Sequence, residues 1–284
     1  MKIDIKYIPE KYWEERLNKD FSLSGVGHLG FGLEYNIWLY KSRLHVLRGL
    51  LIKNNIVCKG KKILDIGVGT GFYIDFWEKL GAKKITGIDI TNKSIEELKE
   101  KYPNYRFTKG NISTLDYNKK FPDEKFDIIT AFDVLFHIVN EEDFKNAIEN
   151  IRKFSHKETI ILIMDNILKE YKPAREHEND RTFLYYKKVL NSYSREIKEI
   201  KPLFYFMNTP IDIKRIDNKF LVYFIKIMWK INAKIRSIYR KLGLLGKKID
   251  YIWAFILYFL DRIILKYTNI GPSTKLLLAK LKTK

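Results

Sequence analysis

An apolar run that enters a glycine-rich turn and then a helix-like segment constrains this chain more than any other feature. It reads Ile63-Leu64-Asp65-Ile66-Gly67-Val68-Gly69-Thr70-Gly71-Phe72. Glycines permit the tight geometry of such a turn, and a helix that starts there offers free backbone N–H donors. The pattern predicts a strand, a turn that contacts a ligand, and a helix.

The sequence around this turn alternates between strand-like and helix-like segments. Strands are expected at 62–66, 84–90, 105–108, 126–134 and 158–165, and helices at 72–80, 94–101 and 141–154. Such alternation predicts an α/β fold with a Rossmann-like, doubly wound sheet. Right-handed crossovers place every strand-to-helix loop at the carboxyl ends of the strands, so a ligand is expected at that edge.

Two acidic residues indicate what kind of ligand the turn accepts. Asp65 precedes the first glycine by two residues, and Asp89 follows that glycine by 22 residues, at the end of the second strand. A carboxylate at Asp65 repels a pyrophosphate and suits a cationic amino group. A carboxylate at Asp89 is placed to accept both hydroxyls of a ribose. The acid before the glycine turn therefore suits a ligand with a cationic amino group better than a nicotinamide dinucleotide.

With these residues the sequence resembles class I S-adenosylmethionine (SAM)-dependent methyltransferases, whose first motif is D-x-G-x-G-x-G. The resemblance covers roughly residues 61–165 and extends to Gly110-Asn111-Ile112 and to the strand that ends Phe132-Asp133. It implies a seven-stranded sheet with an antiparallel last strand, SAM as the cofactor, and Asn111 facing the adenine amino group. The cofactor-binding residues expected from it are Asp65, Gly67, Gly69, Gly71, Asp89, Ile90, Asn111, Ile112 and Phe132, with Tyr40 and Arg43 as candidates for the methionine carboxylate.

Candidate catalytic residues follow the fourth and fifth strands. Asp133 and His137 lie where the resemblance places the reacting methyl, and a histidine has the intrinsic pKa of a base at neutral pH. The alternative for His137 is packing on a first helical turn, and that for Asp165, which ends the fifth strand, is capping of the next segment.

Three further residues are candidates for substrate contacts. His28 lies in a glycine-rich stretch that is suited to a lid, and His177 and Arg181 are spaced to hold an anionic substrate. The alternative for this pair is a solvated loop. We expect no metal site, because the sequence lacks a cluster of ligands with metal-binding spacing.

The chain divides into four expected parts. These are a helical cap at 1–59 (helices at 7–17 and 33–53, a loop at 20–32), a SAM-binding core at 60–210, a helical insertion at 211–270 and a final core strand at 271–284. Strands at 196–208 and 273–279 would flank the insertion. That arrangement would place the insertion at the ligand edge, where it would cover or build the acceptor site.

Positive charge is concentrated toward the end of the sequence. The net charge is +19, and residues 219–284 contain 15 Lys/Arg and 2 Asp/Glu, which gives +13. Within the insertion Lys226, Lys230 and Lys234 form one stripe, and an apolar stripe runs beside it: Ile227, Ile231, Ile235, Ile238 and Leu242. This pattern is typical of a helix at an anionic membrane surface, and equally of a helix that packs its apolar face on a core.

The expected function is O-methylation of a small-molecule, sugar or lipid acceptor near a membrane surface. RNA methylation through the basic segment and a non-enzymatic SAM-binding module are the alternatives. The fourth strand lacks the Asn/Asp-Pro-Pro-aromatic motif, and the single cysteine, Cys58, is far from it, so nucleic acid is a less favoured partner. Residues 1–13 lack a secretory pattern and the longest apolar run, 251–260, is too short to span a bilayer. We therefore expect a cytoplasmic protein with peripheral membrane contact.

Overall fold

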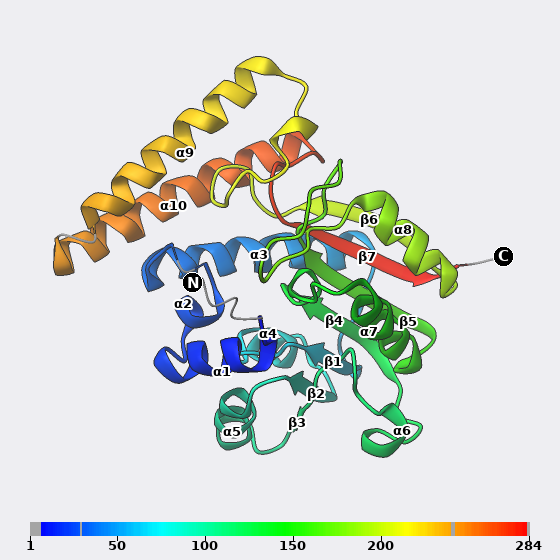
Figure 1. Ribbon diagram of the computed structural model, residues 1–284. Coiled ribbons are helices and arrows are strands. Elements are labelled where there is room, and N and C mark those ends of the chain that lie inside the picture. Colours follow the sequence, from blue (N-terminus) through cyan, green and yellow to red (C-terminus); the bar gives the residue numbers. More distant parts are fainter. Residues whose placement is uncertain (1–6, 29, 240–241, 283–284) are drawn as a thin grey trace, which may run out of the picture.

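Seven strands form one sheet in the order β3-β2-β1-β4-β5-β7-β6 (Figure 1). The computed structural model describes residues 7–28, 30–239 and 242–282. The strands are β1 (Lys62–Ile66), β2 (Lys84–Asp89), β3 (Arg106–Lys109), β4 (Phe126–Phe132), β5 (Ser155–Asp165), β6 (Arg195–Pro202) and β7 (Lys275–Leu281). The first five pair in parallel, and β7 pairs antiparallel with both β5 and β6. The α/β class and the Rossmann-like sheet expected from the sequence are confirmed.

Helices cover both faces of the sheet because successive strand residues point to opposite sides. Ile63 belongs to the apolar cluster that includes α3 (Leu33–Lys53), α4 (Phe72–Lys79) and α5 (Asn92–Lys101). Leu64 belongs to the cluster that includes α6 (Tyr117–Lys120), α7 (Glu141–Lys153) and α8 (Phe183–Ser192). Both clusters consist of buried side chains, so the sheet is enclosed as a doubly wound fold requires.

Two strands end two or more residues earlier than the sequence predicts. The fourth stops at Phe132 rather than residue 134, because Asp133 takes a left-handed backbone conformation (φ 57°). The sixth ends at Pro202 rather than residue 208. The apolar run after Pro202 does not pair as a strand, because the N–H groups of Tyr205, Phe206 and Met207 donate to the carboxylate of Asp261.

Three helices precede the core. They are α1 (Pro9–Lys19), the short α2 (Leu23–Val26) and α3. The expected loop at 20–32 thus contains one helical turn, whose first free N–H groups are partly capped by the Ser22 hydroxyl. Short 3₁₀ turns, η1 (Leu135–His137) and η2 (Ile213–Arg215), follow β4 and precede the last two helices.

The insertion consists of two long helices, α9 (Lys219–Tyr239) and α10 (Gly243–Tyr267). Figure 1 shows α10 lying along α3, with α9 stacked on its far side. The side chains of Ile238 and Tyr239 are outside the described part of the structure. Within the described residues, no helix is both long and apolar enough to cross a membrane.

Candidate functional site

The glycine turn brings two loops of the sheet edge into contact. Gly67 has a φ of 70°, and a Cβ atom on it would lie 2.2 Å from the Val134 side chain. Gly71, at a φ of 77°, begins α4, where a Cβ would meet Leu98 at 2.6 Å. Gly67 and Gly69 line a cavity, whereas Gly71 does not. Gly71 therefore serves the packing of α4 on α5 rather than direct contact with a ligand.

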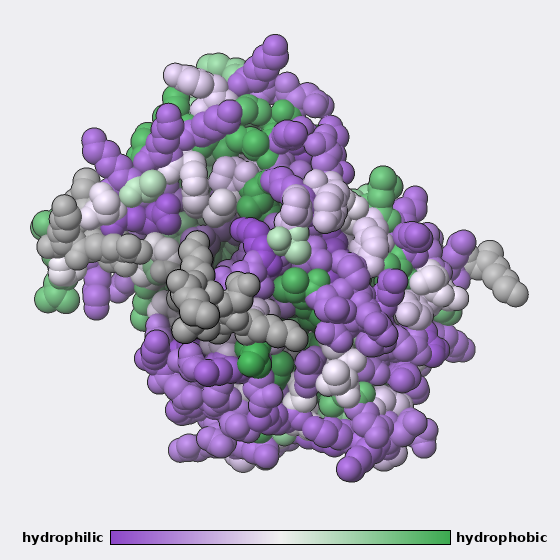
Figure 2. Space-filling model, in the orientation of Figure 1, coloured by the Kyte–Doolittle hydropathy of each residue, from purple (hydrophilic) through white to green (hydrophobic). Residues whose placement is uncertain are grey.

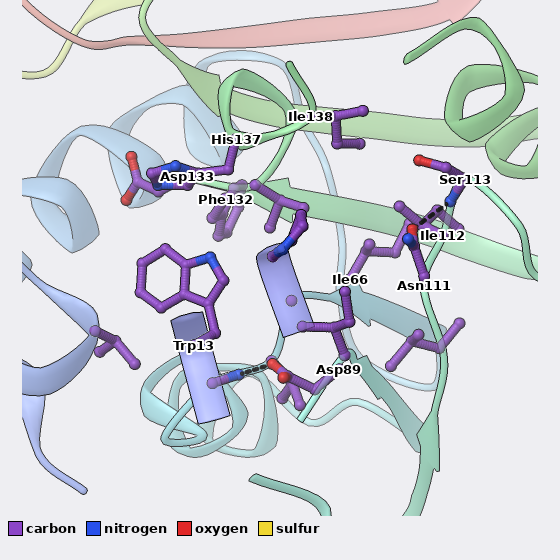
Figure 3. A pocket seen from close by; sticks show the side chains of 18 of the residues that line it. Trp13, Ile66, Asp89, Asn111, Ile112, Ser113, Phe132, Asp133, His137 and Ile138 are labelled. Carbon is purple, nitrogen blue, oxygen red and sulfur yellow. Dashed lines mark hydrogen bonds between the residues drawn. The ribbon is translucent and has the colours of Figure 1, made fainter. Parts of the chain in front are cut away.

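The cavity lies at the carboxyl ends of β1, β2 and β4 and has a volume of about 630 Å³. This volume is within the range of about 300–1,000 Å³ that is usual for small-molecule sites. Figure 3 shows Asp89, Asn111 and Ile112 on one side of it and Asp133 and His137 on the other. Ile90 and Phe132 also line it, as does Tyr40. The structure thus brings most of the predicted cofactor residues to one cavity.

Asp89 is held rigidly at the cavity wall. Its Oδ2 accepts the Gly69 N–H at 2.9 Å, and its Oδ1 accepts the N–H and hydroxyl of Thr91 at 2.9 and 2.8 Å. Burial raises the pKa of this carboxyl, and these hydrogen bonds oppose the rise. A carboxylate has about four lone-pair sites. These hydrogen bonds use three of them, which leaves Asp89 room for a ligand hydroxyl, and its contact with both hydroxyls of a ribose stays a prediction.

Asn111 presents an amide edge beside apolar walls. Its Oδ1 accepts the Ser113 N–H at 2.9 Å, which fixes the side chain and leaves the Nδ2 donors and one Oδ1 lone pair (Figure 3). A donor and an acceptor side by side match the edge of an adenine. The neighbouring wall is apolar, with Ile66, Ile90 and Ile112 among its residues. This part of the cavity fits a flat base.

Asp65 lies behind the cavity, not in its wall. Its side chain is buried; Oδ1 accepts the Thr130 hydroxyl at 2.6 Å, and Oδ2 has no hydrogen-bond partner. Burial raises the pKa of Asp65 to about 7. Asp65 therefore lies outside the cavity wall with one carboxyl oxygen that accepts no hydrogen bond, and its contact with a ligand amino group stays a prediction.

Asp133 and Arg43 form an ion pair beside the cavity. The guanidinium Nη1 is 2.6 Å from the Asp133 carboxylate, and it lies over the Tyr40 ring. Burial raises the pKa of Asp133, and Arg43 acts in the opposite direction. Asp133 and Tyr40 line the cavity, but Arg43 does not. Asp133 therefore engages the guanidinium of Arg43, and the expected contact of Arg43 with a ligand carboxylate stays a prediction.

His137 faces the cavity from η1 with one nitrogen already engaged. Its Nδ1 is 3.0 Å from the backbone oxygen of His177. A carbonyl only accepts, so Nδ1 carries the proton in the neutral ring and Nε2 keeps its lone pair. Burial lowers the pKa of His137 to about 4, so the ring is neutral at neutral pH. Nε2 is therefore unprotonated and free to accept a hydrogen bond at neutral pH, while the lowered pKa makes this ring a weaker base than a free imidazole.

Helix α1, which belongs to the helical cap expected at 1–59, covers the cavity through two residues that the sequence analysis did not name. Trp13 and Leu17 line it, and the Trp13 ring packs edge-on against His137 with centroids 4.9 Å apart. Glu14 accepts the N–H groups of Asn92 and Lys93 at the start of α5, at 2.6 and 3.1 Å. The sequence signal for this contact was the spacing of Trp13 and Leu17, two large apolar residues four positions apart on a mostly polar helix.

Four other predicted site residues lie away from this cavity. Buried Asp165 accepts hydrogen bonds from the Tyr186 hydroxyl and the Asn166 N–H, and burial raises its pKa to about 7. The backbone N–H of His28 donates to Asn36, and burial lowers the pKa of the His28 ring to about 4. These two residues therefore contact the protein rather than a ligand in the cavity.

The pair expected to hold an anionic substrate is also used within the protein. Arg181 is buried, lies over the Phe144 ring at 3.8 Å, and donates to the backbone oxygens of Leu135 and Ile138. The His177 ring stacks on Tyr12 at 5.5 Å. The described residues of the insertion, 211–270, likewise contribute nothing to the cavity wall. The insertion packs on α3 instead, so it does not build this site.

The cavity is acidic in a strongly basic protein. Four carboxylates line it, from Asp89, Asp133, Asp143 and Glu176, and its described wall includes no lysine or arginine. Such a wall favours a cationic ligand and disfavours a phosphate. In the part of the chain that the structure describes, His, Cys, Asp and Glu form no group of three or more suited to a metal ion.

Comparisons with known proteins agree with this geometry. Residues 63–157 match a family model described as a methyltransferase domain. An uncharacterized protein of Haemophilus influenzae is 29% identical over 113 residues, 38% of this chain and 43% of that protein. The ribosomal protein L11 methyltransferase of Aquifex aeolicus is 32% identical over 90 residues, 31% of this chain and 36% of that enzyme. The chain thus spans less than half the length of either relative.

A solved structure has the same fold. The magnesium protoporphyrin IX methyltransferase of Synechocystis superimposes with a TM-score of 0.51 at 15% identity, covering 67% of this chain and 90% of that one. The matching domain spans the glycine turn, Asp89, Asn111 and His137. Residues 63–157 thus match a methyltransferase domain, and the chain shares the fold of a methyltransferase of known structure.

Proposed function

We propose that this chain is a SAM-dependent methyltransferase that methylates a neutral hydroxyl of a small-molecule, sugar or lipid acceptor. One observation carries the proposal. An acidic cavity of about 630 Å³ has a nucleoside-binding side at Asp89 and Asn111 and a neutral imidazole, His137, on its other side.

The residues present fit SAM. The spare lone pair of Asp89 suits one ribose hydroxyl, and the Asn111 amide with its apolar neighbours suits the adenine. The sulfonium and ammonium groups of SAM are cations, which the four wall carboxylates favour. Gly67 lets the backbone approach the cavity where a Cβ would collide with Val134.

When bound, SAM supplies an electrophilic methyl on its sulfonium, and transfer is an in-line displacement. This chain's part is to align the acceptor and exclude water. Trp13 and Leu17 cover the cavity from α1. His137 Nε2 would take the proton of the acceptor hydroxyl, with Nδ1 held by the His177 carbonyl so that the ring keeps its orientation.

The charge of the cavity wall supports a neutral acceptor. A carboxylate or phosphate acceptor would meet the carboxylates of Asp89, Asp143 and Glu176 and no described lysine or arginine in the wall, while Asp133 is paired with Arg43. A hydroxyl carries no charge and gains from a base. The same absence of cations disfavours an RNA backbone inside the cavity, so we do not favour the RNA alternative.

Methyl transfer from labelled SAM to fractionated cell extract, followed by alkali treatment of the product, tests the proposal. We expect label in an alkali-stable ether. Label in an alkali-labile ester or in RNA would overturn the hydroxyl acceptor, and no transfer to any fraction would count against the enzyme.

Two variants test the roles proposed for His137 in catalysis and for Asp89 in cofactor binding. His137→Asn should lower kcat by about 10²–10⁴-fold and leave the Kd for SAM unchanged. Asp89→Asn should raise that Kd by about tenfold or more, through loss of hydrogen bonds to a charged group. Asp123→Asn is the matched control, because Asp123 is exposed in the loop before β4. Equal Kd values for Asp89→Asn and the control would remove Asp89 from the cofactor site.

A further inference from the structure

Helix α10 has a buried inner face that packs on the rest of the protein. Gly246, Asp250, Ala254, Leu257 and Asp261 recur at three- and four-residue spacing and are buried. Asp261 accepts three backbone N–H groups of the segment after β6. The Trp38 ring of α3 contacts the rings of Tyr251, Phe255 and Tyr258 at centroid distances of 5.0 to 5.3 Å.

The opposite side of α10 is apolar and exposed. We call it the outer face, and it consists of Leu245, Ile252, Ile256, Phe259, Ile263 and Tyr267. Their exposed fractions range from 42% for Ile256 to 85% for Tyr267. At 1.5 Å per residue the outer face is about 33 Å long. Figure 2 shows hydrophobic side chains at the surface over the helical hairpin, whereas most of the visible surface is hydrophilic.

An exposed apolar face of this length requires an explanation. Soluble monomers rarely expose contiguous apolar patches larger than a few hundred Å². The outer face is not needed for packing, because the inner face already makes the contacts with α3 and the segment after β6. A partner with an apolar surface of its own would bury these side chains.

The charges around the outer face identify the kind of partner. Lys248 and Lys266 are exposed near its two ends, and Lys226, Lys230 and Lys234 are exposed on the neighbouring α9. The acidic residues of 219–267 are Asp250 and Asp261. Both are fully buried on the inner side of α10. The hairpin therefore presents cations and apolar groups to its surroundings, without an exposed acid.

We propose that the outer face of α10 docks on an anionic lipid bilayer, with the helix lying in the plane of the interface. Its aliphatic and aromatic groups enter the acyl boundary, and lysines at both ends extend to the headgroups. Each lysine close to an anionic surface adds attraction, and apolar burial adds a part that salt does not screen. This inference rests on the exposure and charge of the hairpin and not on the proposed reaction.

Other partners fit the outer face less well. In a symmetric contact between two copies, each outer face would carry Lys248 and Lys266 into the interface, where they would meet like charges. RNA would satisfy the lysines and leave the aliphatic side chains exposed. A bilayer with anionic headgroups satisfies both.

Flotation of the full chain with vesicles tests the proposal. The vesicles are pure phosphatidylcholine or an equimolar mixture with phosphatidylglycerol, at low and at high salt. We expect flotation with the mixed vesicles, part of which persists at high salt. The Phe259→Ser/Ile263→Ser variant should reduce the bound fraction by about tenfold or more through the lost apolar burial.

Ile52→Ser is the matched control, because Ile52 of α3 is 70% exposed and lies outside the outer face. Light scattering and melting curves verify that the variants stay folded. The proposal is overturned if the wild type does not float, or if the double variant and the control bind alike. It is also overturned by a dimer that dissociates in the double variant without vesicle binding, or by retention on single-stranded RNA alone.

Discussion

The guanidinium of Arg43 lies 2.6 Å from the carboxylate of Asp133, which joins α3 to the loop that follows β4. Arg43 is 8% exposed, and Asp133 borders the cavity. The ion pair thus fixes the helices before the core against the part of the cavity that contains His137.

Breaking this pair should be costly, because one charge would stay buried without its partner. We expect Arg43→Met to lower the free energy of unfolding by about 3–5 kcal/mol. The double variant Arg43→Met/Asp133→Asn should recover part of the loss. Urea denaturation of the four proteins in the cycle measures this, and strictly additive effects would contradict a direct coupling.

The glycine turn permits a test with an internal control. Gly67 and Gly60 have φ values of 70° and 75°, but only Gly67 has a neighbour within 4 Å of the missing Cβ, the Val134 side chain. Gly60→Ala should cost about 1–2 kcal/mol of stability and leave SAM affinity unchanged. Gly67→Ala should raise the Kd for SAM by about tenfold or more.

Calorimetric titration of both glycine variants with SAM makes the comparison. Val134→Ala in the Gly67→Ala background should restore part of the affinity. If the two single variants bind equally well, the contact between Gly67 and Val134 does not shape the site.

The cover formed by α1 depends on Glu14, which accepts two N–H groups at the start of α5. Removal of this carboxylate should loosen α1, because hydrogen bonds to a charged group stabilise by about 1.5–3 kcal/mol. We expect Glu14→Ala to raise the dissociation rate of SAM by about tenfold. Stopped-flow fluorescence of Trp13 follows the rate, and Glu15→Ala, exposed on the same helix, should release SAM like the wild type.

His137 should also make stability depend on pH. Burial lowers its pKa from 6.5 to about 4. Between these values the unfolded chain binds a proton that the folded chain does not, so stability is lost as the pH falls from about 6.5 to 4. His28 has the same lowered pKa and acts in the same direction.

Urea denaturation across this pH window tests the effect. His137→Asn/His28→Asn should flatten the curve, whereas His156→Asn, at a partly exposed site in β5, should not. An unchanged slope in the double variant would show that other groups control the acid sensitivity.

The structural features that the sequence predicted correctly depend on residues that are close together along the chain. Asp89 ends β2 and Asn111 lies two residues after β3, and parallel strands bring their carboxyl ends to one edge. Their place at that edge therefore followed from the local pattern, whereas the role expected for Asn111 came from the resemblance to class I methyltransferases. Two of the expected strand ends, after residues 132 and 202, required information that the local pattern lacks.

The features that the sequence did not predict depend on contacts between residues that are far apart along the chain. The apolar run after Pro202 has the composition of a strand, yet Asp261, more than fifty residues later, accepts its N–H groups. The spacing of His177 and Arg181 suggested an anion site, but Phe144 and backbone oxygens occupy the guanidinium. Trp13 reaches the cavity from a helix that Glu14 docks on α5, a contact between residues about 80 positions apart.

The position of β7 between β5 and β6 has a consequence for synthesis on the ribosome. β6 is the edge strand, and β7 is its neighbour in the sheet. Residues 203–274 separate the two along the chain. At ordinary elongation rates the unpaired backbone of β6 waits roughly 4 to 15 s for its partner. In that interval the nascent chain is most exposed to chaperones and to wrong strand pairing, and the insertion helices emerge before the sheet that they flank is closed.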